Sequence, residues 1–335
     1  MTGPLVSVLL PVRDAAATLG SALRSVQRQT LADWECVVAD DGSADDTARV
    51  VDGVAAADAR VRRLALPRHG LVPALNAGLA ACGGTFVARM DADDVMHRDR
   101  LAAQVAALRE DPSLDVVGCH VRCFPRAALT PYRRDYEAWL NAIGSPADVA
   151  REALVECPVA HPTWCVRAEV LRGLGYRDAG WPEDYDLLLR LLRAGGRFGM
   201  VARRLHAWRD GPARLSRIDA RYGLDRFTAC KAAHLASTLL ADRAHYVLWG
   251  YGGTGRALRH ALARLGRHPS HIVEVKRSRI GQRIHGAQVV PVAALTALRG
   301  VPIVVSVARS GPRAEIRAAL AEMSFEELRD FVCAA

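Results

Sequence analysis

Predicted strands and helices alternate through the first 110 residues of this chain. Four short runs of branched apolar residues predict strands at Val6–Val12, Trp34–Ala39, Val61–Leu66 and Thr85–Met90. Each run is followed by a segment whose apolar residues recur every three or four positions, which is the spacing of an amphipathic helix. This order predicts an α/β fold with a doubly wound, mainly parallel sheet. Ligands of such sheets bind beyond the carboxyl ends of the strands.

The rest of the chain divides into less regular and more regular parts. Residues 115–209 show no clear alternation, whereas a new strand-and-helix pattern begins with Tyr246–Trp249. We therefore expect a first α/β domain over residues 1–212, a helical linker over 213–244 and a small α/β domain over 245–335. In the first domain, Asp14 and Ser43 are predicted to cap the helices after the first and second strands.

Composition limits the setting in which this chain works. The net charge is +9, carried almost wholly by arginine. This excess favours an anionic partner, either a diphosphate, a lipid-phosphate acceptor or an anionic membrane face, although a general composition bias explains it equally well. No apolar run approaches the roughly 20 residues of a membrane-spanning helix, and the start of the chain lacks the basic residues of a signal peptide. We expect a cytoplasmic protein, at most peripheral at the inner membrane face, with no nucleic-acid partner. Its eight cysteines are expected to be reduced and mostly buried.

Acidic residues gather at three places along the sequence, namely Asp40-Asp41, Asp91-Ala92-Asp93-Asp94 and Glu183-Asp184. Like charges repel, so a site that collects carboxylates usually handles a cation or a proton. The second cluster follows a predicted strand, and its two carboxylates one residue apart suit a hard divalent ion. Each cluster also has a plain structural reading, because acids favour turns and helix starts.

Five segments, taken together, resemble the family 2 glycosyltransferases with the GT-A fold. They keep the order and spacing of that family over residues 4–216, and they are the segments 6–13, 38–47, 75–79, 90–94 and 181–187. The resemblance implies a metal-dependent, inverting, hexosyltransferase-like enzyme that uses a nucleoside diphosphate sugar, with a UDP-sugar as the favoured donor and Mn²⁺ or Mg²⁺ as the cofactor.

The resemblance also assigns roles to individual residues. Asp184 matches the general base and Glu183 its neighbour, while Asp93, with Asp91, matches the metal ligands. His161 and Trp181 fall on the acceptor side. The residues assigned to the nucleotide sugar are Pro11, Arg13, Asp40, Asp41, Arg68, Asn76, Asp91 and Asp93. Arg68 stands in a departure from the family, which often has Asn before the following Gly.

The expected acceptor is a surface polysaccharide or a lipid-linked oligosaccharide. The Q-x-x-R-W signature of the processive synthases is absent from the sequence, which favours the addition of one or a few sugars. A homo-oligomer is compatible with these features. The alternative from outside the enzymes is a nucleotide-sugar sensor that binds without turnover.

A glycine fingerprint opens the C-terminal domain. Gly250, Gly252 and Gly255 follow a predicted strand and precede a predicted helix, and Glu274 lies about twenty residues further on. This part resembles the small Rossmann-like modules of sugar-modifying enzymes. Three readings stay open: a structural or oligomerising domain, a second nucleotide site, and, least favoured, an NAD(P)-linked oxidoreductase.

Overall fold

The computed structural model describes residues 3–212 and 214–335, which form two compact units. The first unit contains the described residues of Met1–Val149 together with Pro158–Asp178 and Arg190–Ile218. The second contains Ala150–Cys157, Ala179–Leu189 and Asp219–Ala335. The division between the units falls after Ile218, inside the predicted linker 213–244, and two short segments from the middle of the chain are grouped with the C-terminal part.

The helices and strands of the first 110 residues alternate as the sequence predicts, with the short additional strand Val95–Met96 after residue 90, and the elements from residue 116 to 218 follow a less regular order. In chain order, with η for a 3-10 helix, the elements up to residue 218 are β1 (Val6–Val12), α1 (Ala16–Gln27), β2 (Trp34–Asp41), α2 (Thr47–Ala57), β3 (Val61–Leu66), α3 (Leu71–Ala81), β4 (Phe86–Arg89), β5 (Val95–Met96), α4 (Arg100–Glu110), β6 (Val116–Phe124), η1 (Arg126–Ala128), α5 (Pro131–Leu140), α6 (Pro146–Glu152), η2 (His161–Thr163), β7 (Cys165–Arg167), α7 (Ala168–Leu174), α8 (Glu183–Arg193), β8 (Phe198–Arg209) and α9 (Leu215–Ile218).

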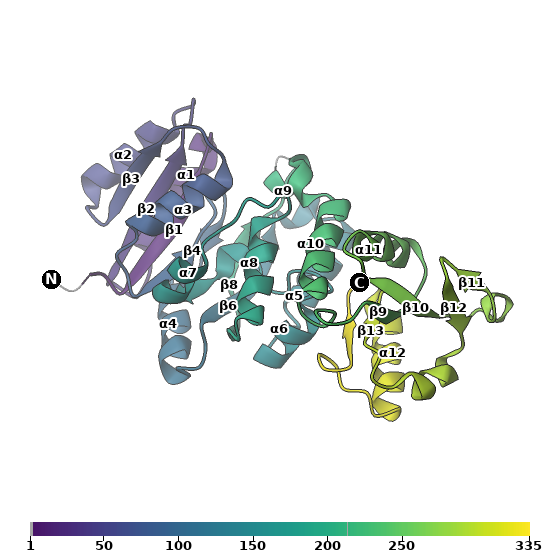
Figure 1. The fold of residues 1–335 in the computed structure, drawn as a ribbon. Coiled ribbons are helices and arrows are strands. Elements are labelled where there is room, and N and C mark those ends of the chain that lie inside the picture. Colours follow the sequence, from purple (N-terminus) through teal and green to yellow (C-terminus); the bar gives the residue numbers. More distant parts are fainter. Residues whose placement is uncertain (1–2, 213) are drawn as a thin grey trace. The chain divides into compact units, whose positions relative to one another are not determined.

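An eight-stranded sheet forms the centre of the first unit (Figure 1). Its strand order is β3-β2-β1-β4-β7-β6-β8-β5, and the first four strands are parallel. β7 runs antiparallel to both β4 and β6, so it closes the parallel half. All seven residues of β1 are buried, as expected of a central strand covered on both faces. The predicted α/β class with a mainly parallel sheet is confirmed.

Helices cover both faces of this sheet, and the two faces are packed differently. Apolar residues of α1, α2 and α4 join the core that contains Val8 and Leu10 of β1. On the other face, Gly78 of α3 lies against β1 and β2. A Cβ at Gly78 would be 2.5 Å from Leu9 Cδ1 and 3.1 Å from Ala39 Cβ, so glycine is what lets α3 approach so closely. The close contact fixes the strand ends where the acids lie.

The predicted caps Asp14 and Ser43 are wrong. α1 starts at Ala16 and α2 starts at Thr47, and neither predicted residue caps them. Instead, Asp14 Oδ1 accepts a hydrogen bond from the backbone N–H of Ala44 at 2.7 Å. The hydroxyl of Ser43 accepts one from the N–H of Asp14 at 3.0 Å. The two polar side chains therefore join the loops after β1 and β2 to each other, a long-range pairing that local cap rules do not foresee.

The second unit is built on its own six-stranded sheet, with strand order β11-β12-β10-β9-β13-β14. All neighbours are parallel except β11 and β12. Counted along the chain, the five parallel strands follow the spatial order 3-2-1-4-5, which is that of a Rossmann sheet through its fifth strand. The elements after residue 218 are η3 (Ala220–Tyr222), α10 (Leu224–Ala236), β9 (His245–Trp249), α11 (Gly253–Ala263), β10 (His268–Val273), η4 (Arg277–Arg279), β11 (Arg283–Ile284), β12 (Ala287–Val290), η5 (Val292–Leu298), β13 (Ile303–Val305), α12 (Ser310–Glu322) and β14 (Phe331–Cys333).

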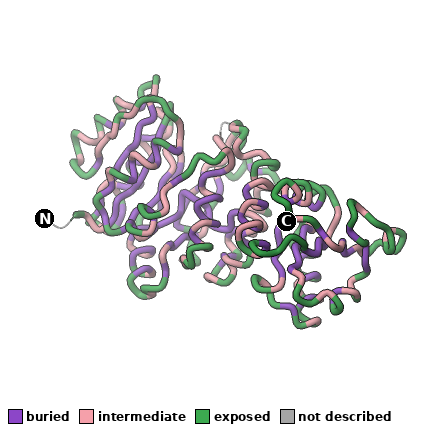
Figure 2. The backbone as a smooth tube through the Cα atoms, in the orientation of Figure 1, coloured by how far each residue is buried: buried purple, intermediate pink, exposed green. Residues whose placement is uncertain are grey.

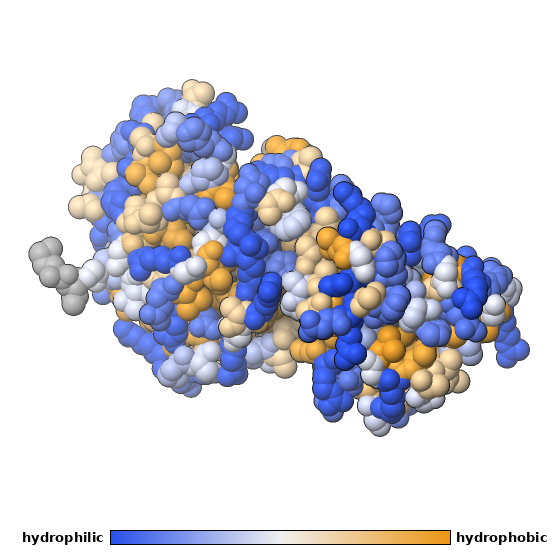
Figure 3. All heavy atoms as spheres, viewed as in Figure 1, coloured by the Kyte–Doolittle hydropathy of each residue, from blue (hydrophilic) through white to orange (hydrophobic). Residues whose placement is uncertain are grey.

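Burial follows the two sheets. Figure 2 shows the buried backbone concentrated along the strands, and separate apolar cores lie on the two faces of the second sheet. All eight cysteines are free and buried, as predicted. Polar and apolar side chains are interspersed over the face seen in Figure 3. Within residues 3–212 and 214–335, no helix has the length and apolar character needed to cross a bilayer.

Candidate active site

Asp41, at the carboxyl end of β2, organises the loop before α3. Its Oδ1 accepts hydrogen bonds from the backbone N–H groups of His69 at 2.8 Å and Gly70 at 2.9 Å. Its Oδ2 lies 3.3 Å from Nη1 of Arg13, the residue directly after β1. Pro11 lies two positions earlier, within β1. Asp41 is only 4% exposed, so this carboxylate holds three segments together.

Asp40 and Gly42 hold the same strand end from either side. Asp40 Oδ1 accepts from the N–H of Ser43 at 3.0 Å, and its Oδ2 lies 3.6 Å from Nη1 of Arg63. Gly42 has a φ of 64°, and a Cβ there would lie 2.9 Å from the backbone N of Arg68. The Asp-Asp-Gly sequence is thus needed for the loop geometry itself, and Arg68 is exposed beside it.

Three carboxylates converge after β4. One oxygen from each of Asp91, Asp93 and Asp94 can be chosen so that all three lie within 4.8 Å of one another. Asp94 is 1% exposed, whereas Asp91 and Asp93 are partly exposed. Arg89, the last residue of β4, forms an ion pair with Asp91. A buried anchor and two accessible acids form the cluster.

A buried chain of hydrogen bonds fixes Asp94. Nε2 of His206, in β8, is 2.8 Å from Asp94 Oδ2, and Nδ1 of the same ring is 3.0 Å from Nη1 of Arg100. Burial, with the charge of Arg100, lowers the pKa of His206 well below its usual value. The ring is therefore neutral, with Nε2–H donating to Asp94 and Nδ1 accepting from Arg100. Arg209 adds its backbone N–H to Asp94 Oδ1 at 2.7 Å, and its Nε donates to the carbonyl of Asp93.

The cluster fits a divalent cation. Carboxylate oxygens are hard ligands of the kind that Mg²⁺ and Mn²⁺ take. Loss of solvent around Asp93, with the charges of Asp94 and Asp91, raises the pKa of Asp93 to about 7. A carboxylate under such repulsion is stabilised by a nearby cation. Because both oxygens of Asp94 already accept hydrogen bonds, Asp91 and Asp93 are the residues that would hold the metal.

Metal binding at this cluster is expected to depend on pH. Without metal, the raised pKa of Asp93 favours the protonated form, so this group stabilises the fold at low pH and loses that contribution as the pH rises through about 7. A metal ion binds only the ionised form. We therefore expect Mn²⁺ to raise the melting temperature more at about pH 8 than at about pH 5.5. Thermal unfolding with and without Mn²⁺ measures this, and a pH-independent shift would contradict it. An Asp93→Asn variant serves as the control that should respond weakly at both values.

Asn76 and His161 both form hydrogen bonds with Tyr176. The side-chain amide of Asn76 donates to the carbonyl of Tyr176 at 2.9 Å, and its Oδ1 accepts from the N–H of Tyr176 at 3.0 Å. His161 is 5% exposed, and its Nε2 lies 2.9 Å from the hydroxyl of Tyr176. Burial, with the charge of Arg89, lowers the pKa of His161 well below its usual value, so the ring is neutral. Both residues support the loop after α7, and their contacts with donor or acceptor stay predictions.

In the second unit, Glu183 and Asp184 begin α8 and differ in environment. Glu183 is 2% exposed, and the hydroxyl of Tyr222 donates to its two carboxylate oxygens at 2.9 and 2.7 Å. Burial and the charges of both acids raise the pKa of Tyr222, so the hydroxyl keeps its proton. Asp184 is partly exposed and accepts from the N–H of Tyr185 at 2.7 Å. Of the two acids, Asp184 is the accessible one.

Trp181 forms a hydrogen bond with a third acid of α8, Asp186. Its indole N–H donates to Oδ1 of Asp186 at 3.1 Å, and Nε2 of His234 lies 3.4 Å from the same oxygen. Asp186 is fully buried. The Trp181 ring is thereby fixed against α8 by the side chain of Asp186.

Comparison with known proteins decides the family. Residues 7–175, half of the chain, match the family described as glycosyl transferase family 2. The chain belongs to this family. Among curated relatives, "Putative glycosyltransferase EpsE" of Bacillus subtilis is 29% identical over 244 residues, covering 70% of this chain and 84% of its own length. "O-antigen biosynthesis protein RfbC" of Myxococcus xanthus is 33% identical over 239 residues, covering 68% of this chain and 17% of RfbC.

Solved structures show the fold of this family 2 member. The S. aureus TarS 1–349 complex with UDP-GlcNAc covers 78% of this chain and 72% of its own, with a TM-score of 0.56 at 17% identity. Mannosyltransferase PcManGT of Pyrobaculum calidifontis, in complex with GDP-Man and Mn²⁺, covers 96% of this chain and 81% of its own, with a TM-score of 0.50 at 20% identity. The GT-A fold and the glycosyltransferase class predicted from the sequence are confirmed. The roles of individual site residues stay predictions.

Proposed function

We propose that this family 2 glycosyltransferase moves a sugar, with inversion, from a nucleoside diphosphate sugar to a hydroxyl group of a growing surface glycan. The observation that carries the proposal is the meeting of Asp91, Asp93 and Asp94 at the end of β4 in a chain of this family. The TarS and PcManGT structures support a nucleotide-sugar donor, because each contains one, and the second also contains Mn²⁺. EpsE is named as a glycosyltransferase and RfbC for O-antigen biosynthesis, which supports a glycan acceptor.

On the donor side, the residues after β1, β2 and β4 would bind the nucleotide and its diphosphate. Asp91 and Asp93 would hold Mn²⁺ or Mg²⁺, and the ion, when bound, offsets the negative charge of the departing diphosphate. Arg13 and Arg68 stand beside Asp41 and Gly42, and their cations suit the same anionic group. A UDP-sugar is the proposed donor, with GDP-sugars as the alternative.

On the acceptor side, Asp184 would take the proton of the attacking hydroxyl. Its position at the N-terminus of α8 stabilises the ionised carboxylate, and its partial exposure leaves it open to a substrate. Glu183 would help to position Asp184, its neighbour in the chain, because the hydroxyl of Tyr222 holds Glu183 at the start of the same helix. A single displacement, in which the acceptor oxygen bonds to the anomeric carbon as the diphosphate leaves, gives inversion.

A donor screen with product analysis tests this function. The protein is incubated with Mn²⁺ and each of several UDP- and GDP-sugars, with and without lipid-linked or oligosaccharide acceptors. We expect one donor to raise the melting temperature and to release its nucleoside diphosphate, with NMR showing inverted anomeric configuration in the product. Retained configuration would contradict the displacement. Donor binding without release of the nucleoside diphosphate, whatever the acceptor, would instead favour a nucleotide-sugar sensor. Binding to anionic vesicles, measured on the same protein, tests peripheral membrane association.

A further inference from the structure

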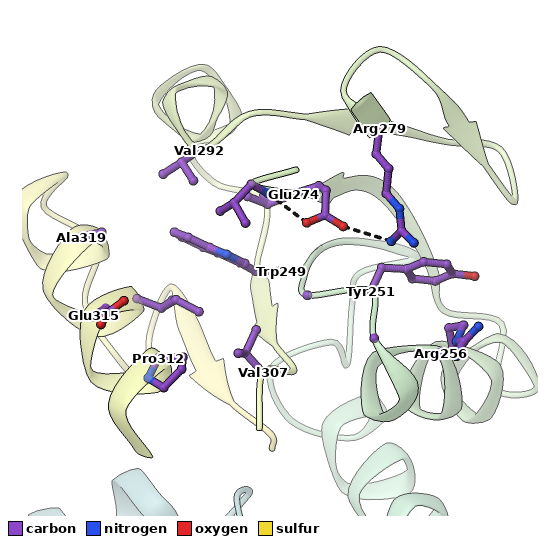
Figure 4. Close-up of a pocket in the computed structure, with 15 residues that line it drawn as sticks. Trp249, Tyr251, Arg256, Glu274, Arg279, Val292, Val307, Pro312, Glu315 and Ala319 are labelled. Atoms are coloured by element: carbon purple, nitrogen blue, oxygen red, sulfur yellow. Dashed lines mark hydrogen bonds and ion pairs between the residues drawn. The ribbon is translucent and has the colours of Figure 1, made fainter. Parts of the chain in front are cut away.

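The second unit contains a cavity of about 660 Å³ at the carboxyl ends of β9, β10 and β13. Trp249 and Glu274 lie at its centre, with Tyr251 and Arg256 on one side and Pro312 and Ala319 on the other (Figure 4). Its size falls in the range of about 300–1,000 Å³ that small-molecule sites occupy. We propose that this cavity binds a nucleotide through its diphosphate and its unmodified ribose, using residues other than those of the proposed transfer site.

The three glycines of the fingerprint have different structural reasons. Gly250 has a φ of 100°, and a Cβ there would lie 2.5 Å from Cγ2 of Val307. At Gly255 a Cβ would lie 2.0 Å from the carbonyl oxygen of Gly250. Gly252 has a φ of −80°, and a Cβ there would meet no described atom within 4 Å. The protein's own packing therefore needs the first and third glycines but not the second. Gly252 is the N-cap of α11, a position where glycine is tolerated, and the open space beside it lets a diphosphate approach the backbone closely.

The surroundings of this loop suit a phosphate group. Gly252 precedes α11, an eleven-residue helix whose first N–H groups and dipole attract anions. Arg256, one turn into the helix, lines the cavity and adds a full positive charge. The hydroxyl of Ser306, 2% exposed at the end of β13, has no hydrogen-bond partner among the described residues. Ser306 lies against Gly250 and Gly255, behind the glycine loop rather than in the cavity lining.

Glu274 is placed to read the ribose. It directly follows β10, the strand next to β9, and its side chain is 17% exposed. Its Oε1 accepts from the N–H of Val275 at 3.0 Å, and its Oε2 lies 3.1 Å from Nη1 of Arg279 (Figure 4). Oε1 also accepts from the N–H of Lys276 at 3.3 Å. An ionised carboxylate has about four acceptor positions, so one remains for a ribose hydroxyl. The same charge repels a ribose that carries a 2′-phosphate.

Apart from the carboxylate of Glu315, the rest of the described lining is mainly apolar. It includes Val275, which is 74% exposed, and the side chains of Val292 and Ile316. Such a wall, with the rings of Trp249 and Tyr251, suits the flat face of a base. The shared chemistry of the ligand is a ribose diphosphate, and its source is either an adenine dinucleotide or the nucleotide of a sugar donor.

Hydrogen exchange on the full-length protein tests the proposal, because it locates binding in the chain. The exchange is measured in chelator, which suppresses metal-dependent binding at the acids after β4. NAD⁺, UDP and NADP⁺ are the probes. We expect NAD⁺ or UDP to slow exchange in residues 249–256 and 273–279. NADP⁺ should need a concentration at least tenfold higher to give the same protection. The probe that protects identifies the source of the ligand.

Two variants and a matched control complete the experiment. Gly252→Val adds a side chain where the protein leaves room, so it should fold normally yet weaken protection by at least about tenfold. Gly53→Val, at another helix glycine with no described atom near its Cβ, should leave protection unchanged. Glu274→Gln should bring the concentrations at which NAD⁺ and NADP⁺ give equal protection closer together. Absence of protection by all three probes, or equal protection in Gly252→Val, would overturn the proposal.

Discussion

An Asp184→Asn variant is expected to transfer sugar about 10²- to 10⁴-fold more slowly than the parent enzyme while it still binds the donor. The amide has nearly the same shape as the carboxylate but cannot take a proton from the acceptor hydroxyl. Asp184 is the accessible acid at the start of α8, and its Oδ1 accepts from the N–H of Tyr185, a contact that the amide oxygen of asparagine can keep. The loss should therefore fall on the chemical step, measured as kcat, with little change in donor affinity measured by calorimetry.

Two further variants separate a role in catalysis from a role in folding. Asp225→Asn is the matched control, because the Asp225 side chain is 79% exposed in the same unit and should tolerate the change. Glu183→Gln should lower kcat less than Asp184→Asn, since Tyr222 can still donate to the amide oxygen. Unchanged transfer by Asp184→Asn, or a loss in Glu183→Gln that exceeds it, would remove Asp184 from the role of base.

The parallel half of the first sheet could be predicted because its signals are local. An unbroken apolar run such as Val6–Val12 specifies a strand buried on both faces, and the observed burial agrees. The helix Leu71–Ala81 follows β3 as predicted for the same reason: its apolar spacing and its flanking glycine and turn residues are all within a few positions. Such elements need no information from distant parts of the chain.

β8 was missed because its pattern is not that of a regular strand. The middle residues of Phe198–Arg209 are exposed, and the pairing with β6 shifts register near His120, so hydrophobic alternation is lost. The consequence reaches the acidic cluster, because β8 carries His206. Asp94 and His206 are 112 positions apart, and the pairing of β8 with β6 on one side and with β5 on the other, where Met96 lies opposite His206, brings that histidine to the site.

The same distinction holds for the candidate site as a whole. The acids at 91 and 93 are visible in sequence because the chemistry needs them next to one strand end. Their supports are not visible, since Arg100 reads as one more polar residue of a helix although it is fully buried. A single adjacent clue existed in Asp94, a third acid whose burial demands a partner. Tyr222, which donates to Glu183, lies 39 positions away and carries no comparable signal.

Removal of the metal ligands should have the second large effect on transfer. We expect Asp91→Asn and Asp93→Asn to slow transfer by about 10²- to 10³-fold at low Mn²⁺, because cation stabilisation of a leaving diphosphate is worth several kcal/mol. Chelation of the divalent ion in the parent enzyme should produce a loss of similar size. Asp46→Asn provides the control, since the Asp46 side chain is 65% exposed and pairs only locally with Arg49.

A Mn²⁺ titration distinguishes a weakened metal site from a damaged fold. Each variant loses one charged ligand but keeps an oxygen at the same position, so a higher Mn²⁺ concentration should restore part of the rate and shift half-saturation upward. Asp94→Asn should behave differently, because the amide cannot accept from both the N–H of Arg209 and the ring of His206; its loss should appear as a lower melting temperature that Mn²⁺ does not repair. Full transfer in chelator, or losses at Asp91 and Asp93 that no Mn²⁺ concentration reduces, would show that these carboxylates act in some way other than by holding a metal ion.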